Sequence, residues 1–152
     1  MGTSKFSGAI IAAAQEAQRQ TKCPASVTLA QWALESGYGK YCSAPNNYFG
    51  IKWHSKCSYP SHEVATKECY NGKWVVIQAK FIAFPSLEAA CTYHGRLLMS
   101  PTGPYKSAIK FAGNWKEFLH AIAHIYATDP KYEEKIASII TSNGLDTYDV
   151  AV

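Results

Sequence analysis

The stretch ASVTLAQWALESGYGK, residues 25–40, decides the fold of this chain. Val27, Ala30 and Leu34 recur within it at helical spacing, which predicts a helix over 25–36 with one apolar face. A proline precedes this segment, and Gly37 is a natural helix stop. The stretch therefore predicts a helix that packs on a core and ends beside Glu35.

Glu35 is the first candidate for chemistry. Its neighbours one and two turns back are Gln31 and Thr28, which predicts a polar stripe beside the apolar face. Such a stripe is most often a solvated face. The negative end of the helix dipole, however, disfavours a carboxylate in the last turn, and Trp32 and Tyr38 can partly desolvate it. A carboxyl group that keeps its proton is what a general acid requires.

The second candidate is Glu68, which lies in the stretch VATKECYNGKWVVIQAKFIAF, residues 64–84. Asn71-Gly72 between two extended runs predicts a hairpin near 63–83 with a two-residue turn. In that register Glu68 pairs with Val75 and lies on the apolar face of the hairpin, whereas a slip of one residue moves it to solvent. Two carboxylates across an aromatic groove are the arrangement that glycoside hydrolysis needs.

Helical patterns lie on both sides of the hairpin. They predict further helices over 5–21, 87–99, 115–127 and 130–141, with a loop over 41–62. Ser86, Asn114 and Asp129 are the expected N-caps of the last three helices. The predicted fold class is α+β, mainly helical, with one inserted hairpin.

Composition limits the function classes. The chain has 152 residues, which suits one domain over 1–152; its 17% charged residues argue against a disordered chain. The net charge of +4 includes no run of Lys or Arg, so we expect no nucleic-acid partner. No apolar stretch predicts a membrane span, and the N-terminus lacks the pattern of an export signal.

The 5 cysteines have spacings that match no zinc or redox motif. We expect mostly buried, reduced thiols, at most one disulfide, and no catalytic cysteine. A bridge between Cys57 and Cys69 across the base of the hairpin is the pairing left open. The sequence predicts no metal site and no cofactor.

Four motifs occur in order along the chain: ASVTLAQWALESGYGK, NNYFGIKW, the TKE hairpin and YATDPKY. Together they resemble glycoside hydrolase family 73, the bacterial N-acetylglucosaminidases of autolysins, flagellar proteins and phage endolysins. The resemblance covers about residues 5–141. It implies a lysozyme-like fold with the hairpin overhanging an active-site groove. It also implies cleavage of the β-1,4 bond after N-acetylglucosamine in peptidoglycan.

The resemblance also assigns roles by position. Glu35 matches the general acid, Glu68 the second carboxylate, and Tyr126 a tyrosine implicated in catalysis. The positions that match the groove and substrate-binding motifs are Asn46, Asn47, Phe49, Gly50, Lys52, Trp53, Asp129 and Tyr132. One departure is visible: Thr92 and Tyr93 precede His94, where many members have an Asp-His pair.

Several residues also have ordinary structural interpretations. Asp129 is expected to cap a helix, and His94 to be a buried structural histidine. Tyr126 suits the core, Asn46-Asn47 a turn, and Trp53 and Trp74 either the core or a sugar platform.

Other functions stay open. A lytic transglycosylase or a muramidase on a related fold is the close alternative, and a non-catalytic wall-binding module is a third. We expect a monomer that acts on the cell wall, in the periplasm or outside the cell. Without an export signal, the chain would stay in the cytoplasm until a holin or another route releases it.

Overall fold

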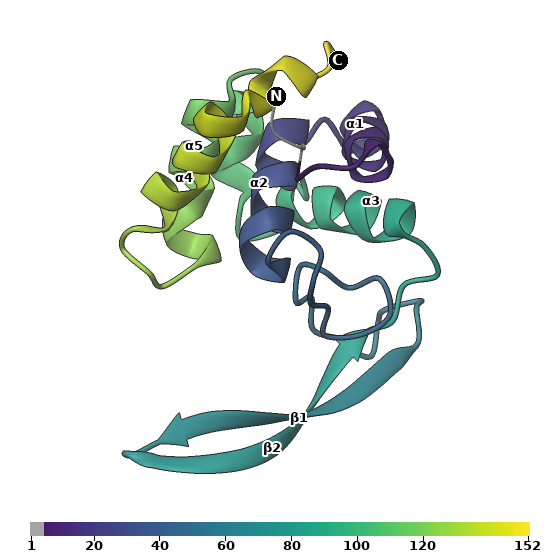
Figure 1. Ribbon diagram of the computed structural model, residues 1–152, viewed down its shortest axis with the longest axis vertical. Helices are drawn as coiled ribbons and strands as arrows, with labels where there is room; N and C mark the ends of the chain where they lie inside the picture. Colours follow the sequence, from purple (N-terminus) through teal and green to yellow (C-terminus); the bar gives the residue numbers. More distant parts are fainter. Residues whose placement is uncertain (1–4) are drawn as a thin grey trace.

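Helix α2 (Ala25–Ser36) lies among the other helices in the computed structural model, which describes residues 5–152 apart from the side chain of Glu68 (Figure 1). It contacts α1, α3, α4 and α5. The other elements are α1 (Gly8–Thr21), β1 (Ser61–Tyr70), β2 (Lys73–Ile82), α3 (Leu87–Leu98), η1 (Lys106–Phe111), α4 (Trp115–Tyr126), α5 (Tyr132–Asn143) and η2 (Leu145–Tyr148). The mainly helical architecture with one inserted hairpin confirms the predicted fold class.

Capping residues set most helix ends where the sequence predicts them. Ser86 and Asn114 accept backbone N–H bonds at the starts of α3 and α4, and Gly37 ends α2 with a φ of 58°. The start of α5 differs, because the prediction of 130 is two residues too early. Residues 130–131 form a turn, and the Asp129 carboxylate accepts the Lys131 N–H bond just before the helix begins.

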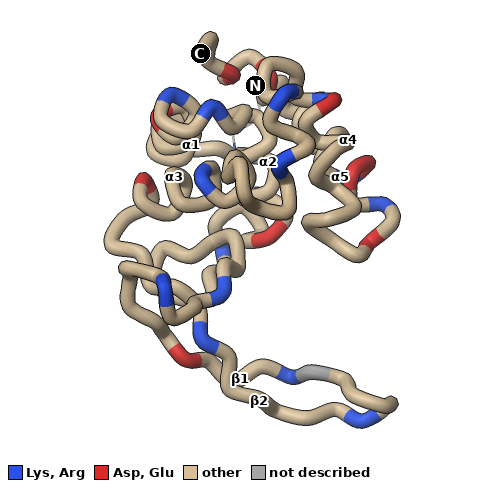
Figure 2. The backbone as a smooth tube through the Cα atoms, turned by 180° about the vertical axis from the view of Figure 1, so that it is seen from behind, with Lys and Arg blue, Asp and Glu red and all other residues tan. Residues whose placement is uncertain are grey.

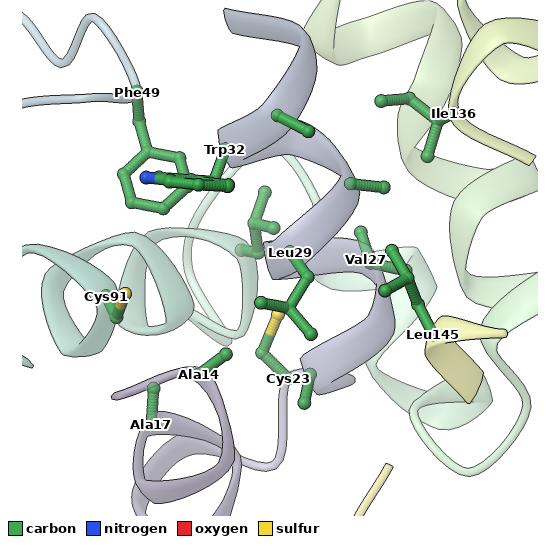
Figure 3. Packing of buried hydrophobic residues seen from close by; sticks show 14 of the residues in the cluster. Ala14, Ala17, Cys23, Val27, Leu29, Trp32, Phe49, Cys91, Ile136 and Leu145 are labelled. Atoms are coloured by element: carbon green, nitrogen blue, oxygen red, sulfur yellow. The ribbon is translucent and has the colours of Figure 1, made fainter. Parts of the chain in front are cut away.

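The polar stripe of α2 is not a solvated face. Thr28 and Gln31 are buried, as is every residue of α2 except Leu34 and Glu35. Figure 3 shows side chains of α2, including Leu29 and Trp32, packed among residues from α1, α3 and α5. Because neighbouring helices cover α2 on several sides, only its last turn reaches solvent.

The hairpin projects from the helical part of the molecule (Figure 1). Its register is the predicted one, with Glu68 paired with Val75 and Tyr70 with Lys73. Asn71 and Gly72 have φ values of 50° and 78°, as a tight two-residue turn requires. At the base, a bridge between Lys52 and Phe81 places the loop alongside β2 as a short third strand.

The expected face of the hairpin is partly confirmed. Thr66 and Ile77 are half-buried on one face, whereas Lys67 and Val76 on the other face are exposed. In this register, position 68 lies on the same face of the hairpin as position 66. The side chain of Glu68 lies outside the described part of the structure, so the prediction that this carboxylate points into the groove stays a prediction.

All five cysteines are free. Cys69 pairs with Trp74 near the tip of the hairpin rather than at its base, so the Cys57–Cys69 bridge does not form. Burial raises the pKa of the Cys23 and Cys91 thiols to about 12, which keeps both protonated and unreactive.

Basic and acidic residues are interspersed over the helices, and lysines also occur along the loop and the hairpin (Figure 2). Within residues 5–152, no helix is long and apolar enough to cross a bilayer.

Candidate active site

An open groove of about 810 Å³ runs past the last turn of α2. Its walls come from α2, the loop before the hairpin, and the segment between α4 and α5. The charged and aromatic residues that line it are Glu35, Phe49, Lys52, Tyr105, Tyr126, Asp129, Tyr132 and Lys135. The groove therefore brings together most of the residues that the sequence assigns to catalysis and binding.

Glu35 lies at the end of α2 with its side chain open to the groove. Partial burial between the groove walls raises the pKa of its carboxyl group above the ordinary value, and a hydrogen bond with the Tyr132 side chain opposes part of that rise. A carboxyl group with a raised pKa that substrate can still reach is suited to donate a proton.

A sharp turn directly after Glu35 explains the glycines of its motif. Gly37, Tyr38 and Gly39 all have positive φ values of 58°, 62° and 85°. A Cβ atom on Gly39 would lie 2.7 Å from the Trp32 ring, so no larger residue fits there without movement. The Ser36 hydroxyl also accepts the Gly39 N–H bond at 2.8 Å. The turn thus ends α2 directly behind Glu35 and fixes where its carboxyl group emerges.

Two stacked tyrosines face Glu35. The rings of Tyr126, at the end of α4, and Tyr132, at the start of α5, lie 5.6 Å apart at 19°. Burial, together with the negative charge of Glu35, raises the pKa of both phenols well above the usual range. Both therefore stay protonated, and each can donate a hydrogen bond to an oxygen in the groove.

Asp129 lines the groove, and two neighbouring residues hold its carboxylate in place. Its carboxylate accepts the Lys131 N–H bond at 2.9 Å and pairs with Lys135 at 2.6 Å. The Lys135 side chain lowers the pKa of Asp129, so the carboxylate stays ionised. The prediction that Asp129 is the N-cap of the following helix is wrong: α5 begins after Lys131, and the Asp129 carboxylate instead holds the turn that precedes it.

The loop motif places its residues in different positions. Phe49 and Lys52 line the groove. Asn47 is fully buried; its side-chain amide donates to the carbonyls of Ile51 and Ile82 and accepts the Ile51 N–H bond. The amide of Asn46 donates to the Phe84 carbonyl at 2.9 Å. Both asparagines therefore shape the loop.

The two tryptophans named from the sequence lie apart from the groove lining. Trp53 donates from its indole nitrogen to the Tyr59 carbonyl at 3.0 Å and is half-buried. Trp74 is 72% exposed, on the outer part of the hairpin. Neither residue belongs to the described lining of the groove around Glu35.

Several lining residues were not identified from the sequence. Leu34 was expected on the core face but is 37% exposed and lines the groove, because α2 has already left the core at that turn. Tyr105 and Leu97 also line it, from a loop and from α3. No motif marks Tyr105 or Leu97, and only the folded chain brings these two residues beside Glu35.

A protonatable carboxyl group beside an open groove is one of the two carboxyl groups that a glycoside hydrolase uses to cleave its substrate. The sequence profile of the family described as "Mannosyl-glycoprotein endo-beta-N-acetylglucosaminidase" matches residues 11–145. The chain therefore belongs to this glucosaminidase family, glycoside hydrolase family 73, as its motifs indicate.

Individual relatives agree with this assignment. The exo-glucosaminidase LytG of Bacillus subtilis is 36% identical over 131 residues, which cover 82% of this chain. The catalytic domain of the autolysin Auto from Listeria monocytogenes superposes with a TM-score of 0.80 at 30% identity, covering 98% of this chain and 90% of that one. The truncated glycoside hydrolase domain of FlgJ from Salmonella typhimurium gives a TM-score of 0.73 at 31% identity, covering 88% and 91% of the two chains. The chain spans only 45% of the length of LytG and 21% of the Enterococcus faecalis autolysin.

Proposed function

We propose that this chain is a single catalytic domain that cleaves the β-1,4 bond after N-acetylglucosamine in peptidoglycan, with Glu35 as the general acid. The observation that carries the proposal is the raised pKa of Glu35 at the end of α2, in a groove open to a polymer. Membership of the glucosaminidase family supports the substrate class.

In this proposal, Glu35 gives its proton to the departing glycosidic oxygen. The Tyr132 hydroxyl then stabilises the carboxylate that remains. The positive charge that develops on the sugar needs a second partner: either Glu68 or the 2-acetamido group of the substrate itself. Tyr126, protonated and in the groove, orders a water or the acetamido group for this step.

Product analysis tests the reaction. Purified peptidoglycan is digested with the chain, and the fragments are reduced and identified by mass spectrometry. We expect N-acetylglucosamine at the new reducing ends, and long fragments at early times if cleavage is internal. A reducing muramic acid end would indicate a muramidase, and a 1,6-anhydromuramic end a lytic transglycosylase. Binding without any fragment release would indicate a wall-binding module.

Two substitutions separate the possible mechanisms. Glu68→Gln is compared with Glu63→Gln, a matched change on the same strand. If Glu68 acts on water, Glu68→Gln lowers turnover about 100-fold or more, whereas Glu63→Gln and Tyr126→Phe have smaller effects. If the acetamido group is the nucleophile, Tyr126→Phe has the larger effect. Parental turnover in both Glu68→Gln and Tyr126→Phe would contradict the two-site proposal.

A further inference from the structure

Two hydrogen bonds connect His94, in the core of the protein, to the Tyr132 hydroxyl beside Glu35. His94 Nε2, on α3, lies 2.7 Å from Gln31 Oε1, on α2. Gln31 Nε2 donates to the Tyr132 hydroxyl, at the start of α5, at 3.0 Å. Tyr132 in turn lines the groove together with Glu35, and its side chain lowers the pKa of the Glu35 carboxyl group against the rise caused by burial. The three residues behind Glu35 are almost completely buried, with exposed fractions of 1%, 0% and 3%.

The donor and acceptor atoms of these groups fix the direction of each hydrogen bond. The amide of Gln31 donates from nitrogen to Tyr132, so its oxygen faces His94 and must receive a proton there. Burial lowers the pKa of His94 to about 3, so the ring is neutral and its single proton lies on Nε2. Because Tyr132 accepts from Gln31, its one hydroxyl hydrogen is left for Glu35.

This arrangement carries a cost that packing alone does not explain. His94 Nδ1 is buried without a hydrogen-bond partner, and an unsatisfied buried polar atom destabilises the folded state. Apolar side chains of similar shape would fill the same space without that cost. The His94 ring already packs against Phe49, with centroids 4.2 Å apart. A phenylalanine would preserve that contact but would lose the hydrogen bond to Gln31.

We propose that Gln31 and His94 are positioning residues that hold the Tyr132 hydroxyl as a donor to Glu35. This inference rests on the proposed role of Glu35 as general acid. The Tyr132 hydrogen stabilises the carboxylate after proton transfer and keeps the carboxyl group directed into the groove. Without Gln31, the hydroxyl is free to donate elsewhere, and Glu35 loses a bond that favours its charged form.

The sign of the pH effect follows. Weakening a hydrogen bond to the carboxylate raises the pKa of Glu35 further. Activity that requires protonated Glu35 falls as pH rises through this pKa, so the alkaline limb of the rate profile moves to higher pH. The other titratable groups that line the groove are Lys52, Tyr105, Tyr126, Asp129 and Lys135. Of these groups, Tyr126 contacts the His94 ring, with centroids 6.4 Å apart, and His94→Phe keeps an aromatic ring at that contact.

The experiment is a double-mutant cycle on Gln31→Met and Tyr132→Phe, with kcat, KM and the pH profile measured on peptidoglycan. Each single variant is expected to lower kcat about tenfold with little change in KM, and to move the alkaline limb upward. The kcat of the double variant is expected to be no lower than that of Tyr132→Phe alone, because both changes interrupt the same series of hydrogen bonds. His94→Phe keeps the ring packing. It is expected to lower kcat and to move the alkaline limb upward, both by less than Gln31→Met does.

Thr28→Val is the matched control. It removes a buried hydroxyl of α2 that donates a hydrogen bond to the Pro24 carbonyl and takes no part in the hydrogen bonds from His94 to Tyr132. It is expected to lower stability without moving kcat or the alkaline limb. The proposal is overturned if Gln31→Met and His94→Phe both keep the parental kcat and the parental alkaline limb. It is also overturned if the effects of Gln31→Met and Tyr132→Phe on kcat are additive in the double variant.

A readout that does not need activity separates the two proposals. The carboxyl group of Glu35 is titrated by NMR in the parent and in Gln31→Met. An upward shift of its pKa supports the positioning role even if the parent cleaves no glycan, which would refute only the proposed function. An unchanged pKa in a folded Gln31→Met variant overturns the positioning role.

Discussion

The two candidate carboxylates lie in regions with very different surroundings. Glu35 ends a helix that is covered by four others, and the residues before it are buried. Glu68 lies on a hairpin that projects from the body, where Val76 is 64% exposed and hydrogen bonds to loop 51–53 tie down the base. Two-stranded hairpins are marginally stable on their own. The position of Glu35 is therefore set by the core, and that of Glu68 by a two-stranded segment that is hydrogen-bonded to the loop at its base.

The largest stability difference is expected between matched apolar truncations in the two regions. Leu29→Ala, in the buried part of α2, should lower the free energy of unfolding by about 2–5 kcal/mol. Val76→Ala, on the hairpin, should lower it by less than about 0.5 kcal/mol. Urea unfolding followed by circular dichroism measures both. Similar losses in the two variants would show that the hairpin is as integral to the core as α2.

The turn of the hairpin gives a smaller and more local effect. Gly72 has a φ of 78°, so Gly72→Ala should destabilise the hairpin by about 1 kcal/mol. Hydrogen exchange should speed up at amides of β1 and β2 and stay unchanged in α2. Faster exchange throughout α2 would mean that hairpin and helices unfold as one unit.

The smallest effect concerns Glu35 and the pH dependence of stability. The pKa of Glu35 is higher in the folded chain than in the unfolded chain. Its contribution to the stability of the fold is therefore fully present below the ordinary glutamate pKa and is lost as the pH rises through the pKa of the folded chain. Glu35→Gln lacks this loss. The variant should therefore gain stability relative to the parent between acid and neutral pH, by a modest amount because the carboxyl group faces solvent. Thermal melts at both pH values measure the difference; a relative loss at neutral pH would contradict the raised pKa.

Local signals in the sequence predicted the elements that carry both carboxylates. The bounds of α2 and the register set by Asn71-Gly72 were correct because capping, periodicity and turn chemistry act over a few residues. The 3-10 helices η1 and η2 were missed, since such short segments have no repeating apolar pattern.

Contacts between distant residues could not be predicted. Gln31 and His94 are 63 positions apart, and their hydrogen bond depends on how α2 packs against α3. A glutamine one turn before a glutamate looks like part of a solvated face until neighbouring helices cover it. The lining residue Tyr105 reaches the groove for the same reason, through packing that no local pattern encodes.

Glycan release by Glu35→Gln tests the central claim, that the carboxyl group at the end of α2 supplies the proton for cleavage. Glutamine keeps the shape of the side chain but cannot donate a proton in this way. With the fold verified by circular dichroism, release of soluble fragments from purified peptidoglycan should fall about 10²–10⁴-fold relative to the parent. A rate within about tenfold of the parent, less than general acid catalysis contributes, would show that Glu35 is not the acid.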